Sequence, residues 1–60
     1  MEAVLIDGPL EGKKLDVEAV GGRPPSTLDV ADPDGKLLRY CLAEWTQEGL
    51  SADYSYLYPV

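Results

Sequence analysis

Glycine and proline residues divide this chain into short pieces and leave no room for helices that cross over between strands. The 60 residues include six glycines and five prolines, with clusters at Gly8-Pro9, Gly21-Gly22 and Pro24-Pro25. Proline fixes φ and removes a backbone donor, while glycine adopts turn conformations that other residues avoid. The pattern favours several short strands joined by turns, in a single small domain that covers residues 1–60.

The pieces between these breaks have the side-chain patterns of strands. Residues 3–6 are an apolar run that suits a central strand, because both of its faces are apolar. Residues 15–20 and 27–30 alternate apolar and polar side chains, as half-buried strands do. Residues 54–58, Tyr-Ser-Tyr-Leu-Tyr, add high β propensity to the alternation.

Two of the breaks have a clear turn mechanism. In the segment Asp32-Pro33-Asp34-Gly35, proline presets φ, the aspartates can bond local amides, and glycine tolerates a positive φ. The segment Gly8-Pro9-Leu10-Glu11-Gly12 also has the composition of a turn. Both segments are therefore expected to reverse the chain between neighbouring strands.

Residues 36–48 fit two structures. At helical spacing the apolar side chains from Leu38 to Trp45 form one stripe, and intrinsic propensity favours a helix. At a spacing of two, Leu38 and Tyr40 share one face of a strand. The strand interpretation is slightly preferred, because the strand at 54–58 needs a neighbour and a hairpin supplies one.

The order of these pieces resembles that of small proteins encoded by phages and prophages of actinobacteria. Such chains have a Gly-Pro-x-x-Gly turn, here residues 8–12, followed by an alternating strand, here Leu15 to Val20. They close with a Tyr-x-Leu strand, a glycine-containing turn and a Tyr-x-Tyr strand, here Tyr40-Cys41-Leu42, the turn around Gly49, and Tyr54-Ser55-Tyr56. The last turn is longer here and a further tyrosine follows. The resemblance implies an antiparallel β fold and a phage or prophage origin, and it carries no catalytic residues.

Pattern and resemblance together predict an all-β fold. The expected architecture is a small antiparallel curled sheet or partly open barrel of four to five strands. If residues 36–48 were helical, the fold would be α+β instead.

Composition excludes several classes of function. The net charge of −6 opposes direct binding to nucleic acid or to an anionic membrane. The chain has no histidine, and its one cysteine, Cys41, has neither a disulfide partner nor an activating base. Asp29, Asp32 and Asp34 do not have the spacing of a calcium loop. We therefore expect no enzyme, no cofactor, no metal site and no membrane segment, in a cytoplasmic protein.

The aromatic residues near the end of the chain are the candidate protein-binding site. Alternation predicts that Tyr54, Tyr56 and Tyr58 share one face of a strand, with Tyr58 opposite Tyr40. The same register sets Leu42 against Tyr56 and Glu44 against Tyr54. Two interpretations remain open. Either the tyrosines replace the missing phenylalanine as core, or they form with Trp45 an exposed docking patch in which Trp45 is the most exposed member.

These observations favour a non-enzymatic protein–protein interaction module, an accessory protein of a phage or prophage whose partner is a host or phage protein. It would bind through an apolar-aromatic face or an unpaired edge strand. One alternative is a self-assembling minor structural or virion assembly protein that forms a homo-oligomer. A second alternative is an acidic inhibitor of a DNA-binding protein, because net −6 can imitate a phosphate backbone.

Overall fold

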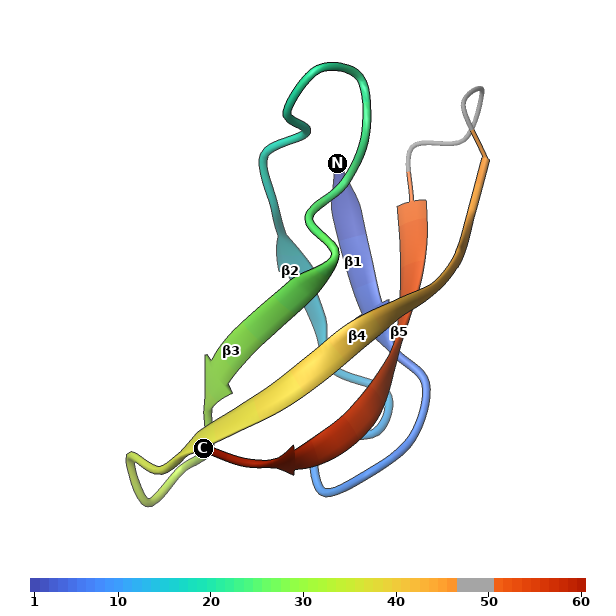
Figure 1. Ribbon diagram of the computed structural model, residues 1–60. Helices are drawn as coiled ribbons and strands as arrows, with labels where there is room; N and C mark the ends of the chain where they lie inside the picture. The colour runs from blue at the N-terminus through green and yellow to red at the C-terminus, as the bar shows by residue number, and fades with distance from the viewer. Residues whose placement is uncertain (47–50) are drawn as a thin grey trace.

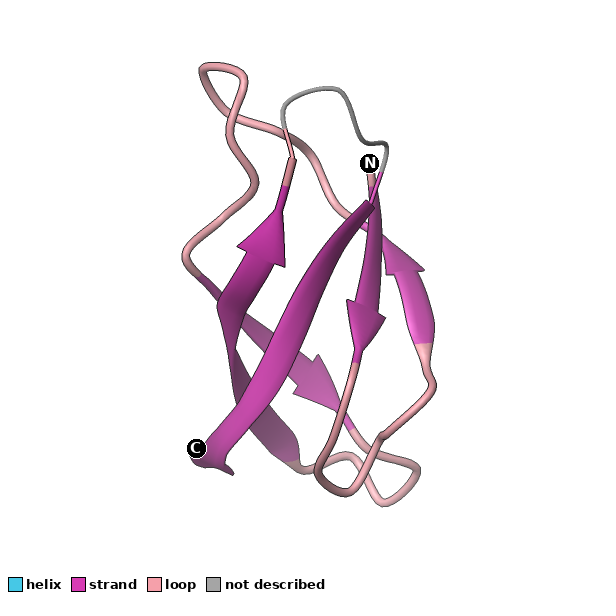
Figure 2. Cartoon of the chain, turned by 90° about the vertical axis from the view of Figure 1, so that its right-hand side faces the viewer, coloured by secondary structure: helices cyan, strands magenta, loops and turns pink. Residues whose placement is uncertain are grey.

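The computed structural model describes residues 1–46 and 51–60, which form one sheet of five strands (Figures 1 and 2). The sheet curls into an open half-barrel, and no helix occurs in the described residues, so the prediction of an all-β curled sheet is confirmed. The turn predicted around Gly49 lies outside the described residues. The spatial order is β2-β1-β5-β4-β3, and the strands are β1 (Glu2–Leu5), β2 (Lys14–Asp16), β3 (Thr27–Ala31), β4 (Leu37–Trp45) and β5 (Ser51–Pro59).

Strand β4 decides the ambiguity of residues 36–48 for the part that the structure describes, residues 36–46, where the helical alternative is wrong. β4 pairs with β3 on one side and with β5 on the other, antiparallel in both cases. The strand form satisfies its backbone groups against two neighbours and also buries Leu38 and Tyr40 on one face. These tertiary contacts outweigh a helix propensity that differs between residues by only about 0.7 kcal/mol.

The pairing of β1 with β5 is parallel, with Glu2 opposite Ser51 and Leu5 opposite Tyr54. The expectation that every pair is antiparallel is therefore wrong for this pair, while β1–β2, β3–β4 and β4–β5 are antiparallel. The expectation assumed that a parallel pair needs a crossover helix. Here β2, β3 and β4 together form the connection, so the chain returns to β1 without a helix.

Strand β2 is shorter than the alternating pattern at 15–20 predicted. It ends at Asp16, and the N–H of Val17 makes one more hydrogen bond, to the carbonyl of Met1 at 2.8 Å. Its partner β1 begins at Glu2, so no strand among the described residues pairs with the residues that follow. Val20 makes only an isolated bridge to Arg23 and is exposed. The alternation of apolar and polar residues therefore continues in the sequence beyond Asp16, where the pairing of β2 with β1 has ended.

The turn predicted at Asp32-Pro33-Asp34-Gly35 is confirmed and joins β3 to β4. The N–H of Gly35 donates to the carbonyl of Asp32 at 2.9 Å, and Gly35 has φ +85°. The Asp32 side chain accepts hydrogen bonds from the N–H groups of Asp34 at 2.9 Å and Lys36 at 2.8 Å. This turn fixes the register that sets Ala31 opposite Leu37.

The loop between β1 and β2 contains the second predicted turn. One backbone hydrogen bond closes the turn within the loop, and another joins the loop to the end of β1. The N–H of Glu11 donates to the carbonyl of Gly8 at 3.2 Å, and that of Gly12 donates to Leu5 at 2.7 Å. The Asp7 carboxylate accepts a hydrogen bond from the N–H of Tyr56 at 2.6 Å. Through the Asp7 side chain, the loop thus makes a further hydrogen bond to β5 beyond the end of β1.

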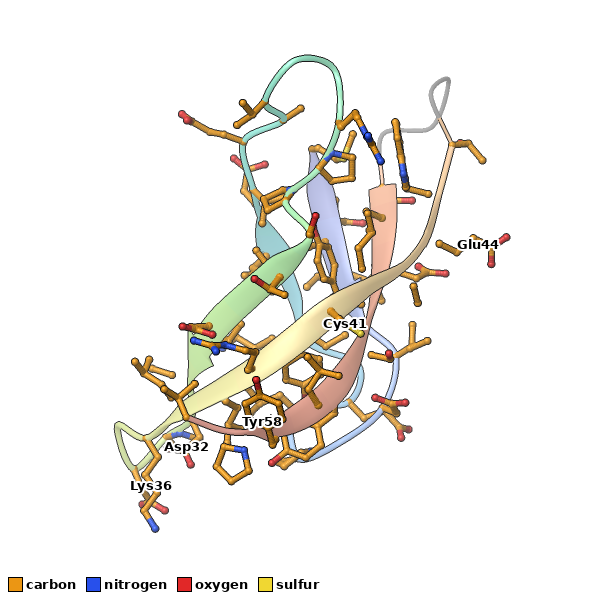
Figure 3. All side chains as sticks on the ribbon, viewed as in Figure 1. Asp32, Lys36, Cys41, Glu44 and Tyr58 are labelled. Atoms are coloured by element: carbon orange, nitrogen blue, oxygen red, sulfur yellow. The ribbon has the colours of Figure 1, made fainter. Side chains whose placement is uncertain are left out.

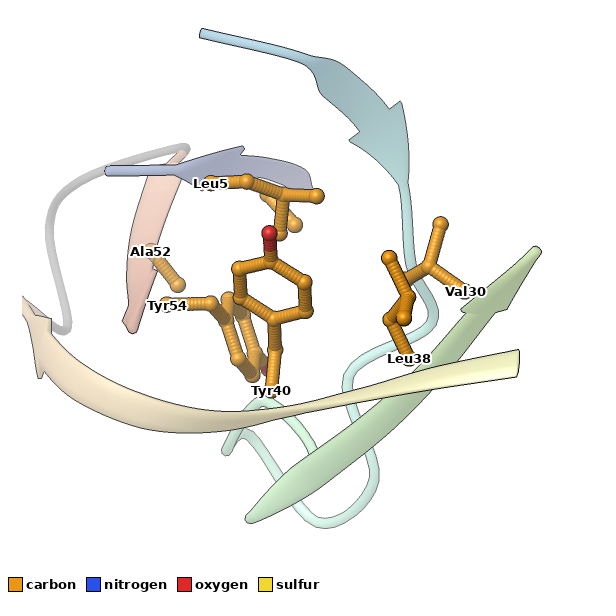
Figure 4. Packing of buried hydrophobic residues seen from close by; sticks show 7 residues of the cluster. Leu5, Val30, Leu38, Tyr40, Ala52 and Tyr54 are labelled. Carbon is orange, nitrogen blue, oxygen red and sulfur yellow. The ribbon is translucent and has the colours of Figure 1, made fainter. Parts of the chain in front are cut away.

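The core lies on the concave side of the half-barrel, and its largest fully buried side chains are Tyr40, Tyr54 and Leu5 (Figure 4). The Tyr40 hydroxyl accepts from the N–H of Leu10 at 3.1 Å and donates to the carbonyl of Asp7 at 3.0 Å. The Tyr54 hydroxyl donates to the carbonyl of Pro25 at 2.7 Å, and burial raises the pKa of Tyr54. Tyrosine fills the place of the absent phenylalanine, and the remaining buried hydrophobic residues are Ala3, Val30, Leu38 and Ala52.

Within the described residues, no helix is present that could cross a membrane.

Candidate protein-binding surface

The outer face of the sheet is the side of β3, β4 and β5 that faces away from the core. Because neighbours along a strand alternate between faces, Leu38 and Tyr40 point inward, and Leu37, Arg39 and Cys41 point outward. The strand register then places outward residues side by side in cross-strand rows. Cys41 and Tyr58 are labelled among them in Figure 3. The rows are Ala31–Leu37–Val60, Asp29–Arg39–Tyr58 and Thr27–Cys41–Ser55.

A bulge in β5 moves Tyr58 to the outer face. Tyr40 lies opposite Tyr56, but the preceding residue, Arg39, lies opposite Tyr58, so Leu57 is the additional residue. An additional residue reverses the alternation that follows it. The prediction that Tyr54, Tyr56 and Tyr58 share one face is therefore wrong for Tyr58.

The register predicted for this hairpin is also wrong, because its pairs are displaced. Leu42 lies opposite Tyr54 and not Tyr56, and Glu44 lies opposite Asp53 and not Tyr54. A second irregularity, between Leu42 and Glu44, brings Trp45 opposite the buried Ala52.

Of the candidate aromatic residues, the structure leaves only Tyr58 on the open surface. Tyr54 is fully buried, and Trp45 and Tyr56 are half-buried and pack against the core. The Tyr56 ring lies 5.4 Å from that of Tyr40 with a tilt of 57°. Trp45 is therefore not the most exposed member of the group. Tyr58, by contrast, is 50% exposed.

The apolar corner, which we define as Leu37, Tyr58 and Val60, is the most apolar part of the outer face. These side chains are 44%, 50% and 62% exposed, respectively. The N–H of Val60 donates to the carbonyl of Leu37 at 2.9 Å, which holds these two residues side by side, and Tyr58 lies in the next row, opposite Arg39. Leu37 and Val60 were not among the sequence candidates. Leu37 could have been found from the turn at Asp32–Gly35, because this turn indicates that a strand starts directly after it. In that strand the neighbour of an inward Leu38 must point outward.

Arg39 borders the apolar corner and contacts both Asp29 and Tyr58. Its Nε lies 2.8 Å from Oδ1 of Asp29 and its Nη2 lies 3.0 Å from Oδ2, a bidentate pair. The guanidinium carbon also lies 5.8 Å from the centre of the Tyr58 ring, within the range of a cation–π contact. The hydrogen bonds from Arg39 lower the pKa of Asp29, and the same contact raises the pKa of Arg39.

Replacing Arg39 with glutamine is expected to raise the pKa of Asp29 toward its ordinary value. An acid whose folded pKa is lowered adds stability above its unfolded pKa and loses it as the pH falls through the folded pKa. The wild-type protein should therefore lose more stability than Arg39→Gln on acidification below about pH 4. NMR titration of the Asp29 carboxyl checks this prediction, which an unchanged titration midpoint in the variant contradicts.

The other end of the outer face is acidic. Glu44 lies opposite Asp53, and these residues border a shallow hollow with Thr46 and Ser51. In the middle of the face, the Cys41 sulfur lies 3.5 Å from the Ser55 hydroxyl. Within residues 1–46 and 51–60, no three histidine, cysteine, aspartate or glutamate residues gather as metal ligands.

Comparisons with models of protein families, with curated proteins and with solved structures found no match. The candidate surface therefore rests on the residues and distances given above.

Proposed function

We propose that this protein is a non-enzymatic protein–protein interaction module that binds its partner through the apolar corner. The supporting observation is where the exposed hydrophobic side chains lie. The large ones among the described residues are Ile6, Val20, Leu37, Leu57, Tyr58 and Val60. Leu37, Tyr58 and Val60 gather at one end of the outer face.

The chemistry of the apolar corner suits protein binding. Tyrosine and arginine are enriched among residues that dominate binding energy, and Tyr58 lies against Arg39 here. The Asp29 contact holds the Arg39 guanidinium in place, which lowers the entropy lost on binding. We further propose a cytoplasmic accessory protein of a phage or prophage, with a host or phage protein as its partner.

Capture of the partner by variant proteins tests this proposal. Lysate of the source organism, at low and at high salt, is mixed with each of three tagged proteins. These are the wild type, the double variant Leu37→Ser/Tyr58→Ser and the control Val20→Ser. Val20 is 76% exposed and lies outside the apolar corner. The Val20→Ser variant therefore also loses exposed apolar surface, but at a different place on the protein. We expect one protein to be captured in stoichiometric amount by the wild type and by Val20→Ser, but not by the double variant.

The other results separate the alternatives. Capture that is lost in high salt and unaffected by the double variant favours an acidic inhibitor of a DNA-binding protein. If only the tagged protein is recovered, a self-assembling structural protein is favoured, and the solution mass at two concentrations then decides. Circular dichroism of each variant confirms that the surface substitutions leave the fold intact.

A further inference from the structure

The outer edge of β3 presents backbone groups that no described strand of this chain pairs. β3 is the last strand in the sheet order, so only its β4 side is paired. The N–H of Asp32 donates to the carbonyl of Lys36 at 2.8 Å, and in an antiparallel pair such positions recur at every second residue. The N–H and C=O groups of Thr27, Asp29 and Ala31 therefore point away from the sheet.

The two free edges of the half-barrel differ in how well they are protected. β2 has three residues and Lys13 precedes it, and short edge strands with lysines discourage pairing. β3 has five residues, none of them lysine or proline. It is therefore the edge at which a further strand finds the longer run of donors and acceptors.

We infer that β3 accepts an extended segment of a partner protein as an antiparallel sixth strand, with a lysine or arginine of that segment opposite Asp29. This inference rests on the proposed binding function and specifies the chemistry of the partner. The residue types expected at the other positions of the segment follow from the residues on the two faces of β3.

The basic residue is indicated by the charge at the centre of this edge. Each Asp29 oxygen accepts one hydrogen bond from Arg39, and a carboxylate oxygen can accept a further one. The Asp29 side chain is 36% exposed and can therefore be reached from the edge. The net charge of −6 also attracts a cationic segment at long range.

Apolar residues of the segment are indicated by both faces of the sheet. On the concave face, Leu28 is half-buried and packs at the border of the core, next to Val30. An added strand with apolar residues opposite both would continue that face. On the outer face, an apolar residue opposite Ala31 would extend the row that Leu37 and Val60 begin.

A second copy of this chain is a poorer occupant of the same edge. Asp29 is the middle residue of β3, so the symmetric antiparallel register that pairs Thr27 with Ala31 of the other copy sets Asp29 against its own equivalent. Like charges directly opposite each other destabilise a pair of strands. The position of Asp29 thus opposes self-pairing and favours a basic strand.

A model peptide tests the inference on the intact protein. The probe is acetyl-Val-Val-Lys-Val-Thr-amide, which sets its lysine opposite Asp29 in the antiparallel register, and the control has glutamate in place of lysine. Both are added to labelled protein up to about 5 mM, a range suited to weak complexes. We expect the lysine peptide to shift the amide signals of Thr27, Asp29 and Ala31, and to bind at least about threefold more tightly than the control.

Proline variants separate edge pairing from nonspecific attraction. Ala31→Pro removes an outward N–H without removing a bond to β4, and should weaken peptide binding about tenfold. Thr27→Pro gives a second test by the same reasoning, and circular dichroism checks that both fold. Absence of shifts, equal binding of both peptides, or full binding by both folded proline variants overturns the inference.

The same experiments keep this inference distinct from the proposed function. Leu37→Ser/Tyr58→Ser retains every outward N–H of β3, so it should still bind the lysine peptide while failing to capture the partner from lysate. Peptide binding without any capture by the wild type would count against the proposed function alone. A solution mass that doubles with concentration, and more readily in Asp29→Asn, would show a second copy at the edge and overturn the inference.

Discussion

Replacing Gly8 with alanine is expected to destabilise the protein by about 2–5 kcal/mol, because two effects add at this position. Gly8 has φ +75°, a conformation that costs a residue with a Cβ about 1–2 kcal/mol. The added Cβ would also overlap the Tyr56 Cβ and would lie 2.9 Å from the Tyr40 hydroxyl. Overpacking of this kind costs typically about 1–3 kcal/mol. Urea unfolding followed by tryptophan fluorescence measures the sum.

Gly12 is the matched control for this prediction. It has φ +89° in the same loop, but a Cβ there would meet no atom within 4 Å. Gly12→Ala should therefore lose only the conformational part, about 1–2 kcal/mol. Since a chain of 60 residues has a stability of about 3–9 kcal/mol, the loss in Gly8→Ala is a large fraction of the total, and its urea midpoint should fall further than that of Gly12→Ala. Equal losses in both variants would show that the contact with Tyr56 does not constrain the loop.

The sequence predicted those parts of the fold that depend on local chemistry. The turn at Asp32–Gly35 could be predicted because its proline, aspartates and glycine each have a local role. The parallel pairing of β1 with β5 could not, because it joins strands from opposite ends of the chain. Alternation shows which residues share a face, but it does not show which strand lies next to which.

The candidate site could be predicted only in part, for a similar reason. Tyr58 was a candidate and lies on the outer face, but simple alternation placed it with Tyr54 on the other side. The bulge at Leu57 has no marker such as glycine, so the reversal of faces leaves no trace in the sequence. Leu37 could have been found from the confirmed turn, whereas Val60 depends on the shifted register.

The tyrosines divide into a structural and a surface group, and their hydroxyl contacts distinguish them. Tyr40 and Tyr54 are fully buried, with hydroxyls bonded to backbone groups of loops. Tyr58 faces solvent and packs beside Arg39. Removal of a single hydroxyl oxygen therefore tests each assignment separately.

Tyr40→Phe is expected to destabilise the protein by about 2–3 kcal/mol, the largest effect of any tyrosine-to-phenylalanine change. The hydroxyl accepts from the N–H of Leu10 and donates to the carbonyl of Asp7, and both groups are partly buried. A buried polar group that loses its partner costs about 1–3 kcal/mol. The loss also frees the loop between β1 and β2, whose Gly8 packs against Tyr56. Thermal unfolding should show a lower midpoint, by about 4–8 °C for each kcal/mol lost.

The other hydroxyls provide graded controls for the role of Tyr40. Tyr54→Phe leaves one carbonyl, that of Pro25, without its donor and should cost about 1 kcal/mol. Tyr58→Phe changes an exposed side chain and should stay within about 0.5 kcal/mol of the wild type. If Tyr40→Phe proved as mild as Tyr58→Phe, the Tyr40 hydroxyl would not be the group that holds the loop between β1 and β2 in place. Amide exchange at Leu10 distinguishes these outcomes, because its N–H exchanges faster in Tyr40→Phe only if the hydroxyl holds the loop in place.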